Sequence, residues 1–387
     1  MKKNESYLFS IVLVLFFTTI SCNNATSQNI TENQINNKLH LLEMNGKCGY
    51  VNYMGEIVIP CKWNEAWDFY DGLAPVKNAS GKWGYIDVHD SLVIPSNWHD
   101  AGMFWDGFAK VKSSNDKYGM INTKGEVVVN CEWINISHFS EGMACVVDEN
   151  DKYGFVDSDG NYVIPCEWEY AYDFSEGMAV VSKDVFEEGF IDKKGNVVIP
   201  CKWQNADSFN EGLAKVQDNK DKYGYIDKTG NLVIPCKWKD ALSYNSGVAV
   251  VQDFNEQWHI INKMGEIICS TQWKFGLPGF ENGLAIVTDK KSKKKGVVNT
   301  KGLIVVPFNW NDTAINIVDG MLRVKDDNGK WGFVDCNTGE LVIPCKWDNF
   351  SDLSDFEHGE AWVKTDNTWR LMDKTGNFIE NSNENTQ

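Results

Sequence analysis

The chain has 387 residues, of which 54 are acidic and 37 basic, so its formal net charge is −17. Only two of the basic residues are arginines, Arg323 and Arg370. Proteins that bind nucleic acid need clustered basic side chains to neutralise phosphate. The composition therefore argues against a nucleic-acid partner and against electrostatic adhesion to anionic lipid. The one basic cluster, residues 290–295, reads as a solvated loop.

The first 22 residues have the pattern of an export signal. Two lysines precede an apolar stretch, residues 8–17, which is too short for a typical membrane span. The next four residues, Thr19-Ile20-Ser21-Cys22, resemble a bacterial lipobox, whose cysteine becomes a lipid-modified N-terminus. Thr19 departs from the usual leucine-like residue, so cleavage after Ser27 is the alternative. We expect an exported, membrane-anchored lipoprotein of the bacterial cell envelope, with a secreted or periplasmic soluble protein as the alternative.

Residues 23–38 are rich in Asn, Gln, Thr and Ser and predict a flexible polar tether. Residues 39–380 have a different character, since they carry an internal repeat. We expect residues 381–387 to be a disordered tail. Length alone would suggest two or three domains, but a repeat favours one continuous array.

A tryptophan marks the repeat. The first seven occurrences are 35 residues apart and the last two steps are 37 residues, through Trp63, Trp98, Trp133, Trp168, Trp203, Trp238, Trp273, Trp310 and Trp347. A fixed period in this range indicates repeated supersecondary units that bury their apolar faces against their neighbours.

Each unit contains three short apolar segments that favour strands. In one unit these are residues 223–227, 232–235 and 248–251. A longer segment that contains Trp238 separates the second from the third. A tight turn with a glycine such as Gly230 joins the first two. We read the structural unit as a three-stranded antiparallel meander, joined to the next by a Trp-bearing connector, and count ten meanders.

Two further positions recur in the units. The third segment contains a small residue, such as Ala214, where we expect the connector tryptophan to pack. A proline such as Pro235 stands at the end of the second segment. Because proline lacks an N–H donor, we expect it to end that strand.

The sequence therefore predicts an all-β tandem array of about ten three-stranded meanders. It does not decide whether the array stays open or closes. We favour an open superhelix, because ten units would be many for a propeller, and keep a closed propeller-like ring as the alternative.

The signatures K-W-G-Y-I-D, V-I-P and E-G-L-A-x-V resemble the bacterial WG-repeat family over residues 39–380. The literal pair occurs at Trp83-Gly84 and Trp331-Gly332, whereas Trp258-His259 and Trp369-Arg370 depart from it. The resemblance implies an all-β repeat array without chemistry of its own. It says little about ligands.

Eleven cysteines in an exported chain would ordinarily suggest disulfides. Six of them occupy one slot of the repeat, and equivalent atoms of neighbouring units lie roughly 14 Å apart at about 4.8 Å per strand. Disulfides need Cα atoms within about 7 Å. We therefore expect small, buried, reduced thiols at Cys61, Cys131, Cys166, Cys201, Cys236 and Cys345.

No motif in the sequence points to a metal, a cofactor or catalysis. The chain has no C-x-x-C pair, and its six histidines are scattered. Residues 157–161 resemble the start of a calcium loop, but Trp168 stands where the loop requires Glu. Acidic residues recur before a glycine, at Asp71, Asp106, Glu141, Glu176 and Glu211, and we expect them to cap a turn. We expect no enzyme, no cofactor and no metal site.

Exposed aromatic residues are the remaining lead. Trp67 and Trp105 lie outside the repeat pattern, before the acidic-glycine turns of adjacent units, and are our candidate contact patch. The leading hypothesis is a non-enzymatic cell-envelope scaffold or spacer that binds another protein. The alternative is a glycan-binding module that stacks aromatics on sugar rings.

Overall fold

The computed structural model describes residues 38–379, except residues 185, 186 and 367. In this part of the chain the elements are β-strands apart from one short 3-10 helix, η1 (Phe350–Asp352). The expected export signal, nearly all of the expected tether and the expected tail lie outside the described residues.

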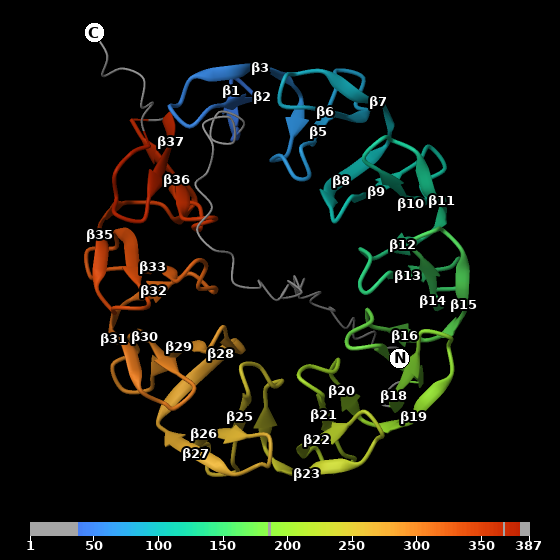
Figure 1. Ribbon diagram of the computed structural model, residues 1–387, viewed down its shortest axis with the longest axis vertical. Helices are drawn as coiled ribbons and strands as arrows, with labels where there is room; N and C mark the ends of the chain where they lie inside the picture. Colours follow the sequence, from blue (N-terminus) through green and yellow to red (C-terminus); the bar gives the residue numbers. More distant parts are fainter. Residues whose placement is uncertain (1–37, 185–186, 367, 380–387) are drawn as a thin grey trace, which may run out of the picture.

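The strands form ten separate antiparallel sheets, which we number 1 to 10 in chain order (Figure 1). Sheet 1 contains β1 (His40–Met44), β2 (Lys47–Val51) and β3 (Ile57–Trp63). Sheet 2 contains β4 (Glu65–Ala66), β5 (Ala74–Lys77), β6 (Trp83–Ile86) and β7 (Leu92–Trp98). Sheet 3 contains β8 (Asp100–Trp105), β9 (Phe108–Lys112), β10 (Tyr118–Asn122) and β11 (Val127–Trp133). Sheet 4 contains β12 (Asn135–Ile136), β13 (Met143–Val147), β14 (Tyr153–Asp157) and β15 (Tyr162–Trp168).

The same order continues around the molecule. Sheet 5 contains β16 (Tyr170–Ala171), β17 (Met178–Asp184), β18 (Glu187–Asp192) and β19 (Val197–Trp203). Sheet 6 contains β20 (Asn205–Ala206), β21 (Leu213–Gln217), β22 (Tyr223–Asp227) and β23 (Leu232–Trp238). Sheet 7 contains β24 (Asp240–Ala241), β25 (Val248–Gln252), β26 (Trp258–Asn262) and β27 (Ile267–Thr271).

Three sheets complete the chain. Sheet 8 contains β28 (Trp273–Glu281), β29 (Leu284–Asp289), β30 (Lys295–Asn299) and β31 (Ile304–Trp310). Sheet 9 contains β32 (Asp312–Thr313), β33 (Met321–Lys325), β34 (Trp331–Asp335) and β35 (Leu341–Trp347). Sheet 10 contains β36 (Glu360–Thr365) and β37 (Thr368–Asp373).

The predicted all-β array of antiparallel meanders is confirmed, and the connector adds one short strand to most sheets. In sheet 6 the connector residues Asn205 and Ala206 pair with Gln217 and Val216 of β21. Figure 1 shows these short strands on the inside of the molecule and β15, β19 and β23 at its outer rim. Each unit therefore spans from the centre of the array to its edge.

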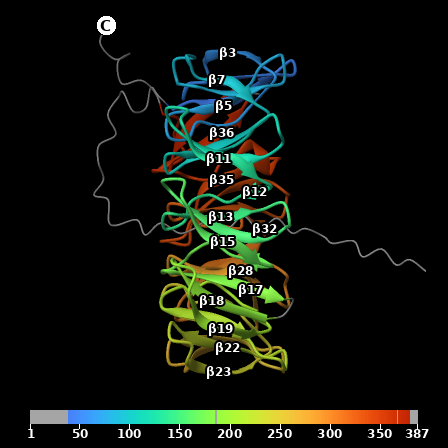
Figure 2. The ribbon, with the colours of Figure 1, turned by 90° about the vertical axis from the view of Figure 1, so that its right-hand side faces the viewer.

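The two ends of the array contact each other, which closes it into a ring (Figure 1). The amide of Leu371 in sheet 10 donates a hydrogen bond to the carbonyl of Tyr53, next to sheet 1, at 3.1 Å. The His40 ring stacks on Trp362 at 5.0 Å between centroids. These contacts correct the expectation of an open superhelix in favour of the closed ring, which was the alternative. Figure 2 shows the ring edge-on as a narrow band of sheets.

The correction has a physical reason. The prediction of an open array rested on the number of units alone. Closure depends on the angle between neighbouring sheets, which a repeat pattern in the sequence does not specify. Closure also covers the faces of both terminal sheets, which an open array would leave to solvent.

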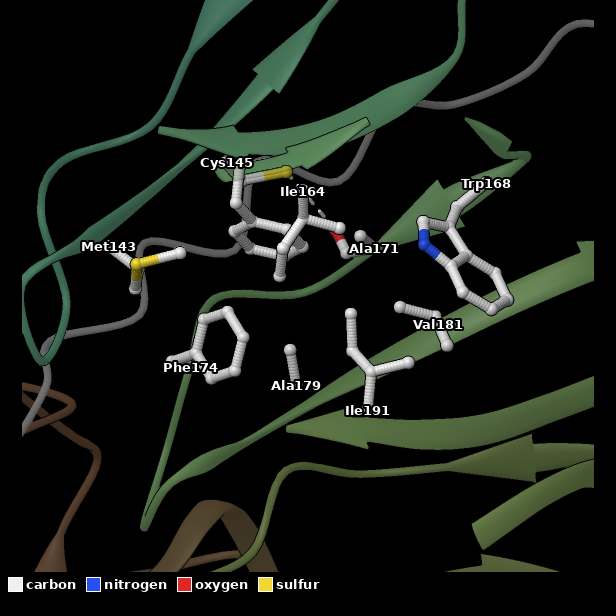
Figure 3. Close-up of a cluster of buried hydrophobic side chains, with 10 residues drawn as sticks. Met143, Cys145, Ile164, Trp168, Ala171, Phe174, Ala179, Val181 and Ile191 are labelled. Carbon is white, nitrogen blue, oxygen red and sulfur yellow. Dashed lines mark hydrogen bonds between the residues drawn. The ribbon is translucent and has the colours of Figure 1, made fainter. Parts of the chain in front are cut away.

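The core lies between neighbouring sheets. One buried cluster joins Trp168 and Ile164 of sheet 4 to Ala179 and Ile191 of sheet 5 (Figure 3). An aromatic pair recurs at several such interfaces, for example Phe190 against Phe209, with ring centroids 4.8 Å apart. The connector tryptophan thus shares a buried cluster with the small alanine of the following unit, as we expected.

The recurring proline does not end its strand, which corrects a second expectation. The outer strand β23 runs through Pro235 to Trp238. Its pairing with β22 shifts register between Tyr225, which opposes Ile234, and Tyr223, which opposes Trp238. Because β23 is the outermost strand of its sheet, the missing N–H of Pro235 has no ladder partner to lose. The proline therefore lies inside a bulged edge strand.

The bulge explains the glycine of the W-G signature. A Cβ on Gly224 would lie 2.5 Å from the carbonyl oxygen of Ile234, a distance that side chains do not tolerate. In sheet 7 His259 replaces this glycine, and there Ile260 pairs with Cys269 and His259 with Ser270 in regular register. The glycine is thus required only where the outer strand bulges across it.

Candidate functional site

The candidate patch is an aromatic surface on sheets 2 and 3, which we call the aromatic ledge: Trp67, Tyr70 and Trp105. The exposed fractions of these side chains are 51%, 37% and 37%. The rings of Tyr70 and Trp105 lie 6.4 Å apart between centroids and are tilted by 37°. Trp67 follows β4, where its carbonyl accepts a hydrogen bond from the hydroxyl of Tyr50 in sheet 1.

The ledge agrees only in part with the sequence prediction. Trp67 and Trp105 are exposed, as expected, but within the described residues no ring contact joins them. Tyr70 is the partner of Trp105, and we did not single it out. The sequence carries a signal for Tyr70, because Tyr70 and Trp105 occupy equivalent positions, each directly before the acidic residue of its turn. The next two sheets have Ser140 and Ser175 at this position.

The acidic residues of the repeat form a latch between neighbouring sheets. The carboxylate of Glu176 in sheet 5 accepts a hydrogen bond from the amide of Gly212 in sheet 6, at 3.0 Å. Lys228, from the hairpin turn of sheet 6, lies 3.0 Å from the same carboxylate. We call this arrangement the carboxylate latch; the other pairs are Asp71 with Gly107, Glu141 with Gly177, Glu211 with Gly247 and Asp319 with Gly359.

The latch refines the expected cap, because each carboxylate serves the turn of the following sheet. Asp106 is an exception, since within the described part of the chain no hydrogen bond joins it to Gly142. The acidic residues also adopt a positive φ, 52° at Glu176, which is uncommon for residues other than glycine. A recurring structural bond accounts for the series without a catalytic role.

A second candidate region lies between sheets 5 and 6. A hollow there is lined by Glu169, Tyr170, Ser182, Asp184, Glu188, Gln204 and Asn205. Tyr170 is 41% exposed, and its ring meets that of Tyr172 edge-on at 4.9 Å between centroids. We call this region the tyrosine hollow.

Burial controls the electrostatics of the region around the tyrosine hollow. Burial raises the pKa of Glu188, although the hydrogen bond that its carboxylate accepts from the amide of Ala206 lowers it. Burial also raises the pKa of Tyr172 above its usual value. Burial also raises the pKa of the nearby Asp173 carboxyl, although the hydrogen bond that Ser137 donates to it lowers that pKa. The hollow therefore combines aromatic faces with hydrogen-bonding carboxylates.

The slot cysteines are only half-buried, which corrects the expectation that these thiols are buried. Cys236 and Cys345 are partly exposed, and burial raises the pKa of each thiol to about 11. Their position explains the difference, because each follows the proline on the outermost strand. The Sγ atom of Cys345 lies 3.9 Å from the carbonyl oxygen of Val324 on the third strand inward. The ten cysteines of the described region are free thiols.

Within the described residues, no cluster of three or more His, Cys, Asp or Glu side chains has the geometry for a metal ion. Nor does the described region contain a helix that could cross a membrane.

A sequence profile of the WG containing repeat matches eight segments of the chain: 49–83, 83–118, 118–153, 153–184, 189–222, 223–258, 296–331 and 331–369. The chain belongs to the WG-repeat family. The profile leaves residues 259–295 unmatched. This interval begins at His259, where the W-G glycine and the register shift opposite it are both missing. The departure in sequence thus coincides with a departure in structure.

Comparison with curated proteins by sequence finds no match. Among solved structures, this WG-repeat chain is similar to a eukaryotic initiation factor, with a TM-score of 0.47, 10% identity and 88% and 94% of the two chains covered. It is also similar to the computationally designed Ika8 protein, with a TM-score of 0.42, 10% identity and coverages of 70% and 95%. For BamB from Moraxella catarrhalis the values are 0.38, 11%, 68% and 93%.

Proposed function

We propose that this WG-repeat ring is a non-enzymatic scaffold of the bacterial cell envelope that binds another protein through the aromatic ledge. The observation that carries the proposal is the exposure of Trp67, Tyr70 and Trp105 on two adjacent sheets. Large aromatic side chains that remain exposed are typical anchors of protein interfaces. The net charge of −17 favours a basic or neutral partner.

The ledge is tested by affinity capture from envelope extract with the double variant Trp67→Ala/Trp105→Ala. We expect loss of a specific, saturable partner while the thermal midpoint stays unchanged. Phe254→Ala is the matched control, because Phe254 is an aromatic residue with 60% exposure that lies in a turn of sheet 7. Capture by the double variant equal to that of the wild type would remove the ledge as the binding site.

The envelope location rests on Cys22. We infer that Cys22 carries a lipid that anchors the chain to a membrane, as the lipobox-like segment before it indicates. Cys22→Ser should move the protein from the membrane fraction to the soluble fraction or block its processing. Unchanged membrane partitioning would contradict the anchor and leave cleavage after Ser27 as the better reading.

A glycan ligand is the second candidate, and the tyrosine hollow favours it. Tyrosine rings provide a face for sugar stacking, and Glu188 with Ser182 and Gln204 provides groups that could bond sugar hydroxyls. Binding to an oligosaccharide array should then depend on Tyr170 and not on Trp105. If Tyr170→Ala leaves glycan binding unchanged, this candidate fails independently of the ledge.

A further inference from the structure

Sheet 7 departs from the repeat at two facing positions. His259 on β26 stands one repeat period after Gly224, and Ser270 on β27 stands one repeat period after Pro235. The two departures meet, because His259 and Ser270 are direct partners in the ladder between these strands. Opposed side chains of an antiparallel pair lie close together on one face of the sheet. A histidine and a serine therefore face each other where sheet 6 has a glycine and a proline.

The His259 ring has a hydroxyl on one side and a carboxylate on the other. Its Nδ1 atom lies 2.9 Å from Oγ of Ser270, and its Nε2 atom lies 3.4 Å from Oδ2 of Asp253. An ionised carboxylate is only an acceptor, so Asp253 selects the tautomer that carries its proton on Nε2. Nδ1 then has a free lone pair, which accepts the hydrogen bond from the Ser270 hydroxyl.

The turn that joins β25 to β26 holds Asp253 in place. Its Oδ1 atom accepts hydrogen bonds from the amides of Asn255 and Gln257, each at 2.9 Å, while Oδ2 faces the imidazole. The hydrogen bond from the Gln257 amide lowers the pKa of Asp253, although desolvation raises it. The hydrogen bonds from His259 and Asn255 lower this pKa further. The carboxylate is therefore ionised at neutral pH, as the Nε2–H tautomer requires.

Packing fixes the His259 ring, whereas Ser270 is open to solvent. His259 is 5% exposed and lies against the Trp238 ring of sheet 6, with 5.7 Å between centroids. Ser270 is exposed on β27, at the outer rim of the ring (Figure 1). A fixed base beside an accessible hydroxyl suits nucleophilic attack by serine, since the imidazole needs no reorientation and a reagent can reach Oγ.

We propose that Ser270 is a nucleophilic modification site, with His259 as its general base and Asp253 as the positioning residue. The substrate class is an acyl donor with a good leaving group, such as an aryl ester or a thioester. Oγ of Ser270 forms a bond to the carbonyl carbon, and the bond from this carbon to the leaving oxygen or sulfur breaks. The proton moves from Oγ to Nδ1 of His259 and then to the leaving group. The products are O-acyl-Ser270 and a free phenol or thiol.

This site is independent of the scaffold function. It lies on sheet 7, whereas the aromatic ledge lies on sheets 2 and 3. One acyl group is transferred to each chain, so the reaction modifies the scaffold and involves no turnover. Loss of partner binding in the ledge variants and loss of acylation at Ser270 are therefore separate outcomes.

Labelling of the full-length chain with an alkyl fluorophosphonate tests the site, because this reagent phosphonylates activated serines and releases fluoride. We expect peptide mass spectrometry to find the label on Ser270. Ser270→Ala should abolish this label, and His259→Gln should slow it by at least about a hundredfold, since a general base contributes that much. An aryl acetate should likewise acetylate Ser270 in a Cys269→Ala background, which removes the neighbouring thiol.

Ser292 is the matched control within the same chain. It is exposed, and its hydroxyl donates to the carboxylate of Asp289 at 2.6 Å, so the acceptor of its hydrogen bond is a carboxylate and not an imidazole. Labelling of Ser292 as fast as that of Ser270 would overturn the proposal. A wild-type labelling rate in His259→Gln would do the same.

Imidazole rescue separates the chemistry from an effect on folding. His259→Gly introduces the residue that Gly224 supplies in sheet 6 and leaves space beside Ser270, so added imidazole should raise the labelling rate at least about tenfold. Asp253→Asn keeps an acceptor for the turn amides but removes the charge. Combined with His259→Gly, it should abolish the rescue while the thermal midpoint stays that of His259→Gly. Equal rescue with and without Asp253→Asn would remove the positioning role of Asp253, and no rescue in folded His259→Gly would contradict the general base.

Discussion

The amide nitrogen of Gly177 in sheet 5 donates a hydrogen bond to the carboxylate of Glu141 in sheet 4, 36 residues earlier, at 2.9 Å. Lys193 of sheet 5 lies 3.3 Å from the same carboxylate and donates to the Glu141 carbonyl at 2.7 Å. One acidic side chain thus holds the turn and the hairpin of the following sheet. Because neighbouring sheets are not joined by a continuous ladder, such bonds and the apolar core are what connect them.

The first prediction concerns this latch. Glu176→Ala removes the acceptor of Gly212 and the partner of Lys228, so the free energy of unfolding should fall by about 1–3 kcal/mol. Glu176→Gln keeps an acceptor and should cost less. Urea denaturation measures both effects.

Asp106→Ala is the control for the latch. Asp106 has the same position and a similar positive φ of 51°, but within the described chain it has no hydrogen bond to the next glycine. Any cost of alanine at positive φ is therefore common to both substitutions. Equal losses from Glu176→Ala and Asp106→Ala would show that backbone strain, not the latch, is responsible.

The second prediction concerns the glycine of the W-G pair. Gly224→Ala places a Cβ 2.5 Å from the carbonyl oxygen of Ile234, so the bulge must shift and stability should fall by at least about 2 kcal/mol. Gly102→Ala is the comparison, because the nearest atom to its Cβ is 3.6 Å away. If both variants unfold at the same urea concentration, the bulge does not demand glycine.

Much of the fold could be predicted from the sequence because its determinants are local. Strand residues, turn glycines such as Gly230 and the tryptophan period are visible within a single unit. The predicted strand end at Pro235 was wrong, because a strand tolerates proline when it is the outermost strand of its sheet. The position of a strand in the sheet is not visible within a single unit. Ring closure was not predictable either, because it depends on small angles summed over all the sheets.

The candidate site was less predictable than the fold. Trp67 and Trp105 were recognisable because they break the repeat, and both are exposed. The contact of Tyr70 with Trp105 joins equivalent positions of adjacent units, so it emerges only once the spacing of those units is known. The tyrosine hollow likewise combines residues from two sheets, and no single unit contains it.

The third prediction separates core tryptophan from surface tryptophan. Trp203 is 9% exposed and lies in a cluster with Ala206 and Phe209 of the next sheet. Trp203→Ala should therefore cost roughly 3–5 kcal/mol, with the greatest loss of exchange protection in the flanking sheets. Trp105→Ala should cost under about 1 kcal/mol and weaken partner binding instead. Equal destabilisation would assign Trp105 to the core and remove it from the ledge.

The last prediction concerns the pH dependence of the ring seam, which is the contact between sheets 1 and 10 that closes the ring. The His40 ring contacts the rings of both Trp362 and Trp369, and Asp68 approaches it at 3.8 Å. Burial lowers the pKa of His40 below 6.5, although Asp68 raises it. The unfolded chain therefore binds the proton more readily than the folded chain. Stability should be lost as the pH falls from 6.5 through the lowered folded pKa.

His40→Phe keeps a ring against Trp362 but cannot titrate. In that pH window it should reduce the slope of unfolding free energy against pH by up to about 1.4 kcal/mol per pH unit, which is the contribution of one proton. Burial also lowers the pKa of His138, far from the seam, so His138→Phe should reduce the slope separately and additively. An unchanged slope in His40→Phe would show that His40 takes up its proton equally in the folded and unfolded chains, and the seam would then not respond to acid through this residue.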